Sequence, residues 1–405
     1  MSKKNILFYI ILLGLISSII PYILGLGGDN VFIKDFYAKR IMVLVTIPLI
    51  FLMLISTKIK LNLKITFYLF FTIFYLVFSL VLKNPINYLV TDLYIILLPI
   101  VFLLLLKEIP NSHKNDFFFN KLYITSLVLS MIIVSLGIKL QYSYLSLIGI
   151  IYILFYAKIT TYKSYFLLLL LPIIIYESLI GKNAVIMLLM LLLLSLFFEK
   201  KLISKSRKYF IIMLIISISL TIGTLLHDVI IQNDAYKHFI YFLRHANFYT
   251  LEFNDNSTGN RIFEAIEVLN TFNTNNIINK FFGNGLGAVI DLSKTIDSTV
   301  LKANIDATKI HHIHMGIFTV LHRYGLFGIT IYLVFIIKTF KLSLFFIKKS
   351  NKLYIKLSAL YLIIILFDSL ISFPHMVSNY FFWFSFALII REKNILKRKT
   401  YANPN

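Results

Sequence analysis

Long apolar runs separated by short polar segments recur along this chain, with one large polar exception. The runs have the length that crosses a bilayer as a helix, and they predict about twelve membrane spans. They lie at 5–26, 41–56, 65–82, 88–106, 119–138, 143–157, 164–180, 183–198, 209–226, 313–337, 353–372 and 377–390. We therefore expect an all-α, polytopic membrane helix bundle. Residues 1–226 supply the first nine spans, 227–312 form one large loop, and 313–405 supply three spans and a basic tail.

Composition supports this class of protein. Hydrophobic residues make up 59% of the 405 residues and charged residues only 14%, far from the averages of soluble domains. The net charge of +22 would suggest a nucleic-acid partner in a soluble protein, but membrane proteins collect Lys and Arg on cytoplasmic loops. We expect no nucleic acid, because the anionic lipid of the inner leaflet is a sufficient partner for these loops. The absence of cysteine excludes disulfides and thiol nucleophiles.

Positive charge predicts the sidedness of the bundle. Most of the 40 Lys and Arg residues lie at the two termini and in alternate loops, near residues 58–64, 107–121, 158–163, 200–208 and 338–356. The intervening short loops contain few. Because Lys and Arg accumulate on the cytoplasmic side, both termini are expected there, and the loop 227–312 is expected to face outward.

The outer loop has a pattern of its own. Apolar residues recur three or four apart within 261–282 and predict an amphipathic helix. Residues 254–259 supply turn and N-cap side chains before it. Gly283, Gly285 and Gly287 follow as a glycine-rich turn, and the polar stretch 291–308 is expected to form a flap.

Two features of this loop permit phosphate binding. Arg261 is expected to open the amphipathic helix, where a guanidinium and a helix N-terminus both favour an anion. The alternative, favoured by spacing alone, is a surface arginine paired with Glu264 or Asp255. The three glycines resemble a phosphate-binding loop only in composition. They do not join a strand to a helix, so a tight turn is the favoured interpretation.

Three histidines lie where the chain re-enters the membrane, at His311, His312 and His314. A metal site is one alternative, because residues 311 and 314 can share a helical face. Without cysteine, and with the nearest acidic residues in an expected loop, we predict no metal. A near-neutral pKa suits His314 better to a role as general base or hydrogen-bond partner of a sugar hydroxyl.

At re-entry, His314 is followed by apolar residues four and seven positions later and by glycines at positions eleven and fourteen. These residues are Phe318, Leu321, Gly325 and Gly328. With Arg261 and the glycine-rich turn upstream, the chain resembles the bacterial O-antigen polymerase and O-antigen ligase superfamily. The resemblance implies a fold of the C-type glycosyltransferase kind in the bacterial inner membrane. It departs from the family at Lys182, where an arginine after a serine is usual, and at Met315, where asparagine is usual.

The resemblance also implies chemistry. A polyprenyl-diphosphate-linked glycan would be the donor and a second glycan the acceptor, with membrane lipid and a chain-length regulator as partners and no cofactor. Arg261 would hold the diphosphate and His314 would act on the acceptor hydroxyl. The other substrate-binding candidates are Arg244, Arg323, Lys182, His311 and His312. Gly325 and Gly328 would shape the re-entering helix.

The expected function is polymerisation of the repeat units of a surface polysaccharide, such as O-antigen, capsule or exopolysaccharide. One alternative is a ligase that transfers the glycan to lipid A core or to protein, which uses the same chemistry. A second is a flippase or transporter. Transporters place ionisable residues near mid-span and repeat their broken helices. This chain instead gathers its polar groups in one unrepeated loop, which favours an enzyme.

Overall fold

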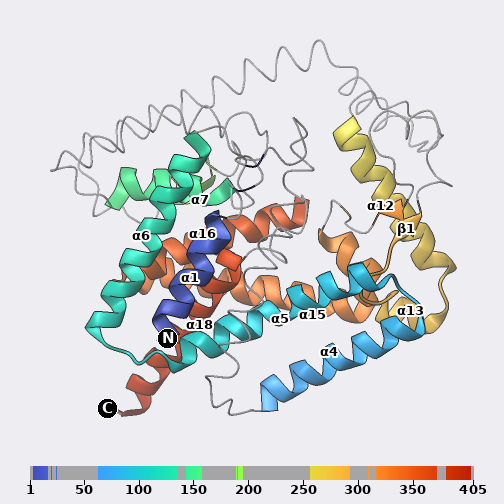
Figure 1. The fold of residues 1–405 in the computed structure, drawn as a ribbon, viewed down its shortest axis with the longest axis horizontal. Helices are drawn as coiled ribbons and strands as arrows, with labels where there is room; N and C mark the ends of the chain where they lie inside the picture. Colours follow the sequence, from blue (N-terminus) through green and yellow to red (C-terminus); the bar gives the residue numbers. More distant parts are fainter. Residues whose placement is uncertain are drawn as a thin grey trace, which may run out of the picture.

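The computed structural model describes residues 3–16, 20, 24, 63–135, 143–156, 188, 190–194, 256–291, 309–310, 313, 316–371 and 380–402. These residues form an all-α architecture with one short β-ladder (Figure 1). Three of the described helices are long and apolar enough to cross a membrane, as a multi-pass membrane protein requires. The expected spans at 41–56, 164–180 and 209–226 lie outside the described residues.

The segment 227–312, expected to face outward, keeps the name outer loop. The helices before it are α1 (Lys3–Ile16), α4 (Leu63–Val81), α5 (Ile86–Glu108), α6 (His113–Ser135) and α7 (Ser143–Ile151), which continues as the π-helix η1 (Tyr152–Tyr156). The outer loop contains α12 (Asn256–Thr274), α13 (Ile277–Phe282), β1 (Ile290–Asp291) and β2 (Lys309–Ile310). The chain then forms α15 (Gly316–Lys349), α16 (Leu353–Ile371) and α18 (Tyr380–Ala402).

Prolines delimit α5. Pro85 precedes its first turn with φ −58°, the angle that the proline ring imposes and that a helix start accepts. The helix ends before Ile109, which is extended and is followed by Pro110, because the residue before a proline is disfavoured in the helical region. Pro99 lies inside the helix, a position that packing against neighbouring helices makes tolerable in a membrane protein.

Helix α16 forms the centre of the bundle. It packs against α15 and α18, and nearly all its side chains from Tyr354 to Leu366 are buried, which is the pattern of a helix surrounded on every side. Aromatic rings join it to its neighbours. The ring of Phe381 on α18 lies 5.3 Å from that of Tyr361 and 4.9 Å from that of Tyr123 on α6.

An ionic cluster joins three segments that the charge pattern assigns to the cytoplasmic side. The Lys352 ammonium lies 3.2 Å from Asp116 and 2.9 Å from Glu392. The hydroxyl of Tyr354 also donates to Asp116, at 2.8 Å. The start of α6, the α15–α16 connection and the last part of α18 therefore meet at one end of the bundle. Figure 1 places both chain termini at this end, far from α12 and α13.

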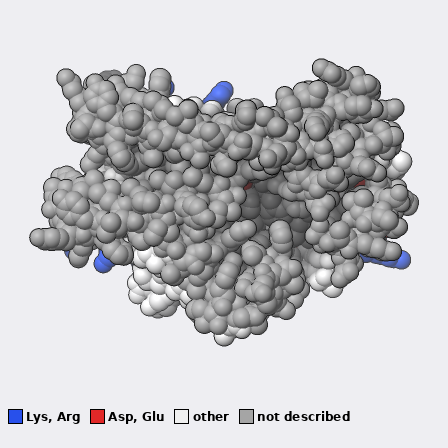
Figure 2. All heavy atoms as spheres, turned by 90° about the horizontal axis from the view of Figure 1, so that it is seen from above, with Lys and Arg blue, Asp and Glu red and all other residues white. Residues whose placement is uncertain are grey.

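Large apolar side chains cover the outside of two helices. On α4 the exposed residues are Phe67, Phe70, Ile73, Val77 and Leu80, three or four apart and therefore on one face. Helix α15 likewise exposes Ile331, Val334 and Ile337. Figure 2 shows the visible Lys and Arg side chains of described residues at the edges of the molecule. Apolar flanks of this size are those of a protein solvated by lipid.

Three boundaries differ from the expected ones. The helix expected over 261–282 is two helices, broken at Asn275 and Asn276, where the Asn276 side chain accepts from Asn279 N and caps α13. Asparagine competes for backbone hydrogen bonds and so favours caps over helix interiors. Helix α15 extends to Lys349, beyond the end expected near residue 337, and α18 extends through the basic tail to Ala402.

Candidate active site

The glycine-rich turn follows α13 directly. Gly283, Gly285 and Gly287 have φ values of 77°, 82° and 73°, in the left-handed region that residues with a Cβ rarely adopt. Gly283 ends α13 and donates its N–H to Asn279 O at 2.7 Å. The turn is therefore built by backbone conformation, as the favoured interpretation of these glycines requires.

The turn is hydrogen-bonded to α15. The N–H of Asn284 donates to His322 O at 2.8 Å, and the N–H of Gly285 donates to Arg323 O at 3.0 Å. In a continuous helix these two carbonyls would accept from residues four positions later. A break in α15 at Gly325, where φ is 62° and ψ −159°, makes them available to the turn instead.

Gly283 and Gly325 also permit the close approach of the two segments. A Cβ on Gly283 would lie 2.3 Å from the carbonyl carbon of Arg323, and one on Gly325 would lie 2.5 Å from Phe281 O. Neither distance is possible for a real side chain. The two glycine motifs, well separated in sequence, therefore interlock backbone against backbone. Gly328 lies one helical turn after the break. A Cβ on Gly328 would lie 2.1 Å from the Cβ of Tyr324.

The α4–α5 hairpin holds the turn from the other side. Ser79 Oγ accepts from Leu286 N at 2.6 Å. The side-chain amide of Asn84 donates to Asn284 O and to Leu286 O, both at 2.8 Å. Because each bond satisfies a backbone group of an irregular segment, the turn can lie between apolar helices without a desolvation penalty.

A buried ion pair completes this arrangement. Arg323 Nη1 lies 2.8 Å from Asp92 Oδ1, and the other carboxylate oxygen of Asp92 accepts from Gly287 N at 2.8 Å. The two side chains are only 4% and 1% exposed. Charge-assisted bonds of this length are strong in a low dielectric. Arg323 was one of the expected substrate-binding cations, and in this structure its guanidinium binds Asp92 of α5, the residue that also accepts from the turn.

The outer-loop helix α12 packs against the segment that leads into α15. Val268 of α12, Ile290 of β1, Ile313 and Leu321 form one buried cluster. Two backbone pairs close the base of the expected flap, Ile290 with Ile310 and Asp291 with Lys309. The flap itself, 292–308, lies outside the described residues. This cluster brings α12, which carries Arg261, to the chain immediately before His314.

Arg261 does not open its helix. Helix α12 begins at Asn256, so position 261 lies in the second turn, past the free N–H groups of the first turn. Residues 256–259, expected as turn and cap, belong to the helix. Residues 256–260 are types that locally favour caps and turns, a weak preference that tertiary context routinely overrides. The position of Arg261 is two helical turns before Val268, the residue that contacts the re-entry segment.

The other side of the re-entry segment contacts α16. Gly316, the first residue of α15, lies so close to Ser369 that a Cβ would be 2.3 Å from its carbonyl oxygen. Tyr332 also donates its hydroxyl to Ser369 O, at 3.4 Å. Asp368, the adjacent residue, is fully buried. A carboxylate within a span is costly and marks a functional position by default.

Of the expected site residues, His311, His312, His314, Lys182 and Arg244 lie outside the described residues. His314 falls between two described anchors, Ile313 in the buried cluster and Gly316 against α16. Within the described ranges, no three His, Cys, Asp or Glu side chains are grouped as metal ligands. The histidines on which the metal alternative rested are not among them.

The partners of the turn were not predicted from the sequence. Asp92 is a single charge near one end of the apolar run 88–106, and the sequence gives no comparable signal for Ser79 or Asn84. A carboxylate inside an apolar run was the available signal. Its partner could not be read from the sequence, because Arg323 is 231 positions away.

Comparison of the sequence with models of protein families gives no match, and a search of curated proteins finds none that is significantly similar. The assignment of function therefore depends on the residues themselves and on the geometry around them.

Proposed function

We propose that this protein is a polytopic membrane glycosyltransferase of about twelve spans with a C-type fold. It polymerises polyprenyl-diphosphate-linked repeat units of a surface polysaccharide at the outer leaflet of the bacterial inner membrane. Both termini are cytoplasmic, and a chain-length regulator is a partner. The proposal rests on the motif residues Arg261, His314 and the paired glycines.

One observation carries the proposal. Gly283 and Gly325, which belong to the two separate motifs behind the resemblance, meet backbone against backbone. The buried cluster of Val268, Ile290, Ile313 and Leu321 gathers α12 and the re-entry segment at the same corner. Motifs that serve one active site must converge in space, and a site held on packed helices can orient its groups.

The reaction is a displacement at the anomeric carbon of the donor. An acceptor hydroxyl oxygen forms the new glycosidic bond, the bond from that carbon to the diphosphate oxygen breaks, and polyprenyl diphosphate leaves with the electron pair. Diphosphate is a good leaving group, so neither ATP nor a nucleotide sugar is needed. The protein orients the reactants and stabilises the developing charge.

Arg261 and His314 have separate roles in this reaction. The Arg261 guanidinium binds the diphosphate through parallel hydrogen bonds. His314 accepts the proton of the acceptor hydroxyl as general base, a role suited to a near-neutral pKa. The turn formed by Gly283 to Gly287, bonded to Asp92 and to the Arg323 carbonyl, holds the part of α15 that follows the re-entry segment.

The test uses the full-length protein in its own cells. His314→Ala and Arg261→Ala should each abolish long-chain polysaccharide while the protein remains in the membrane at normal amounts. His113→Ala, on the opposite side, and Lys280→Ala, on α13, are matched controls that should make normal polymer. Normal chains from either of the first two variants would disprove the role given to that residue.

Deletion of the protein distinguishes polymerase from ligase. A polymerase mutant carries single repeat units on its surface lipid, because individual units are still transferred. A ligase mutant accumulates long chains on the polyprenyl carrier instead. Analysis of surface and carrier-linked glycans by gel and mass spectrometry would separate the two outcomes.

A further inference from the structure

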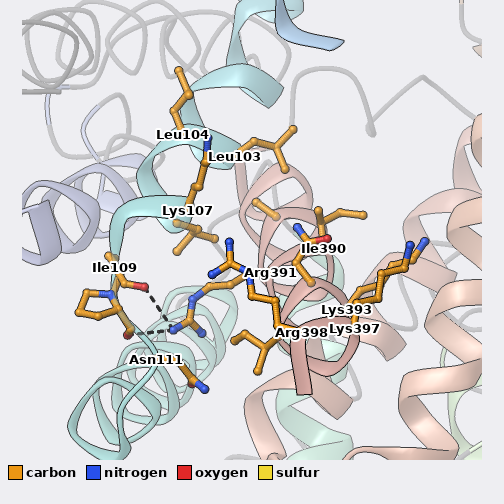
Figure 3. Close-up of a pocket in the computed structure, with 15 residues that line it drawn as sticks. Leu103, Leu104, Lys107, Ile109, Asn111, Ile390, Arg391, Lys393, Lys397 and Arg398 are labelled. Atoms are coloured by element: carbon orange, nitrogen blue, oxygen red, sulfur yellow. Dashed lines mark hydrogen bonds between the residues drawn. The ribbon is translucent and has the colours of Figure 1, made fainter. Parts of the chain in front are cut away.

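A large pocket lies at the opposite end of the bundle from the glycine-rich turn. It has a volume of about 760 Å³ and lies between the last turn of α5, the 109–111 connection and the C-terminal part of α18 (Figure 3). Its size is in the range of sites that bind small molecules. Helix α5 is a candidate membrane span that ends at Lys107, so the pocket lies where this span leaves the membrane.

The pocket is strongly basic. The charged residues that line it are Lys107, Arg391, Lys393, Lys397 and Arg398. No Asp or Glu is among its fifteen lining residues, all of which belong to the described part of the chain. Glu392 lies next in sequence to two of these cations, but its carboxylate is bound to Lys352 at 2.9 Å. The nearest acidic side chain on α18 is therefore engaged away from the pocket.

This concentration of charge is unfavourable without an anion. Lys393 and Lys397 are four residues apart on α18 and lie side by side in Figure 3, a spacing at which like charges destabilise a helix. Lys107, from α5, also lines the pocket. An anionic group bound among these residues would relieve their mutual repulsion.

The membrane side of the pocket is apolar. Leu103 and Leu104 of α5 and Ile390 of α18 line it, one turn or less from the cations. A small inorganic anion would gain no favourable interaction with these apolar side chains. An amphiphile with a phosphate at one end and an acyl chain at the other satisfies both parts of the lining.

The wall of the pocket is rigid. Arg391, which is 8% exposed, donates to Pro110 O at 3.1 Å and to Ile109 O at 3.4 Å (Figure 3). Its guanidinium also lies 5.1 Å from the centre of the Phe119 ring. These contacts hold the α5–α6 connection against α18. The pocket is therefore formed before any ligand binds.

We propose that this pocket is a binding site for an anionic phospholipid of the leaflet on the side of the chain termini. The anionic head group binds among the cations that line the pocket, which include the exposed Lys107, Lys393 and Lys397, and the first part of an acyl chain lies against Leu103, Leu104 and Ile390. Basic pockets between spans at the cytoplasmic surface have the chemistry that recognises anionic head groups.

The test compares two lipids with identical acyl chains. Full-length purified protein is titrated with dioleoyl phosphatidylglycerol or dioleoyl phosphatidylcholine, and bound lipid is counted by native mass spectrometry. We expect phosphatidylglycerol to be retained preferentially. The triple variant Lys107→Gln, Lys393→Gln, Lys397→Gln should lose about 100-fold in affinity for it, since each lysine near an anionic head group contributes about fivefold.

The control removes the same charge elsewhere. Lys338→Gln, Lys341→Gln, Lys349→Gln changes three exposed lysines of α15 that do not line the pocket, and it should bind phosphatidylglycerol within about twofold of the unchanged protein. The corresponding lysine-to-arginine triple at the pocket should also retain binding. Equal losses in the two glutamine triples would overturn the proposal, because the effect would then be one of net charge.

Two further outcomes would overturn it. One is equal retention of the two lipids by the unchanged protein. The other is competition by inorganic phosphate at the same concentration as the lipid, which would indicate an anion site without a role for the apolar wall. All the substituted lysines are exposed, so a normal melting temperature is expected for every variant and separates lost binding from lost folding.

Discussion

Asp92 of α5 and Arg323 of α15 form a buried ion pair, with Oδ1 and Nη1 2.8 Å apart although the residues are 231 positions apart in sequence. The second oxygen of the same carboxylate accepts from Gly287 N. One side chain therefore ties the outer-loop turn and the re-entering helix to the α4–α5 hairpin.

Breaking this pair should strongly destabilise the protein. Asp92→Asn or Arg323→Gln leaves the partner charged and buried, at a cost of about 3–5 kcal/mol in the free energy of unfolding. Unfolding of the purified protein by denaturing detergent would measure it. The double variant should be destabilised by less than the sum of the single changes, because neither charge is then left alone. Simple addition of the two effects would contradict a direct interaction.

The partly exposed cluster at the other end should contribute much less. Lys352→Gln removes ion pairs with Asp116 and Glu392; the side chains of Lys352, Asp116 and Glu392 are 26%, 20% and 8% exposed. Solvent screening limits the expected loss to about 0.5–1 kcal/mol. The same unfolding titration, repeated at high salt, should reduce the difference between variant and unchanged protein. A loss as large as that at Asp92, or one independent of salt, would contradict this interpretation.

Gly325 should tolerate no side chain. Gly325→Ala forces a Cβ to within 2.5 Å of Phe281 O at a φ of 62°, so the turn and α15 must separate, with a loss of at least about 2–3 kcal/mol in the free energy of unfolding. Gly149→Ala is the control, since its Cβ would meet chiefly the flexible side chain of Met131. Melting temperatures of the two variants would test the difference. Equal melting temperatures would show that the break in α15 is not required.

The β-ladder can be tested by cross-linking, because the chain has no cysteine. Asp291 and Lys309 are paired across β1 and β2, at a Cα separation that a disulfide spans. Asp291→Cys with Lys309→Cys should form an intramolecular disulfide on mild oxidation, visible as reduced gel mobility of a proteolytic fragment pair. Asp291→Cys with Lys280→Cys should not. Failure of the first pair to cross-link would mean that the ends of the loop 292–308 are not held together.

Asp368 should matter for activity more than for folding. Asp368→Asn keeps the size of this buried side chain but removes its charge next to Ser369, which contacts the re-entry segment at Gly316. If His314 is the base, as proposed, polymer yield should fall about tenfold or more, with normal amounts of protein in the membrane. Asp291→Asn, an exposed carboxylate of the outer loop, should leave the yield unchanged. A normal yield from Asp368→Asn would remove this residue from the site.

The pattern of apolar residues predicted those features that depend on local sequence. The runs at 65–82, 88–106 and 353–372 form α4, α5 and α16 within a few residues, because a long apolar segment satisfies its own backbone only as a helix. The turn at Gly283 to Gly287 was likewise evident from its glycines. The break in α15 at Gly325 was not evident from the sequence. An isolated glycine is tolerated inside a helix, and no local signal distinguishes such a glycine from one at which the helix breaks.

The sequence by itself therefore determined an all-α protein with apolar helices long enough to cross a membrane. Only the tertiary structure decided that Gly283 meets Gly325, that Asp92 binds Arg323, and that Val268 and Ile313 belong to one buried cluster. The physical reason is that helix formation depends on neighbours within a turn or two. These contacts instead depend on how helices far apart in the sequence pack, and hydrophobic periodicity carries no information about partners.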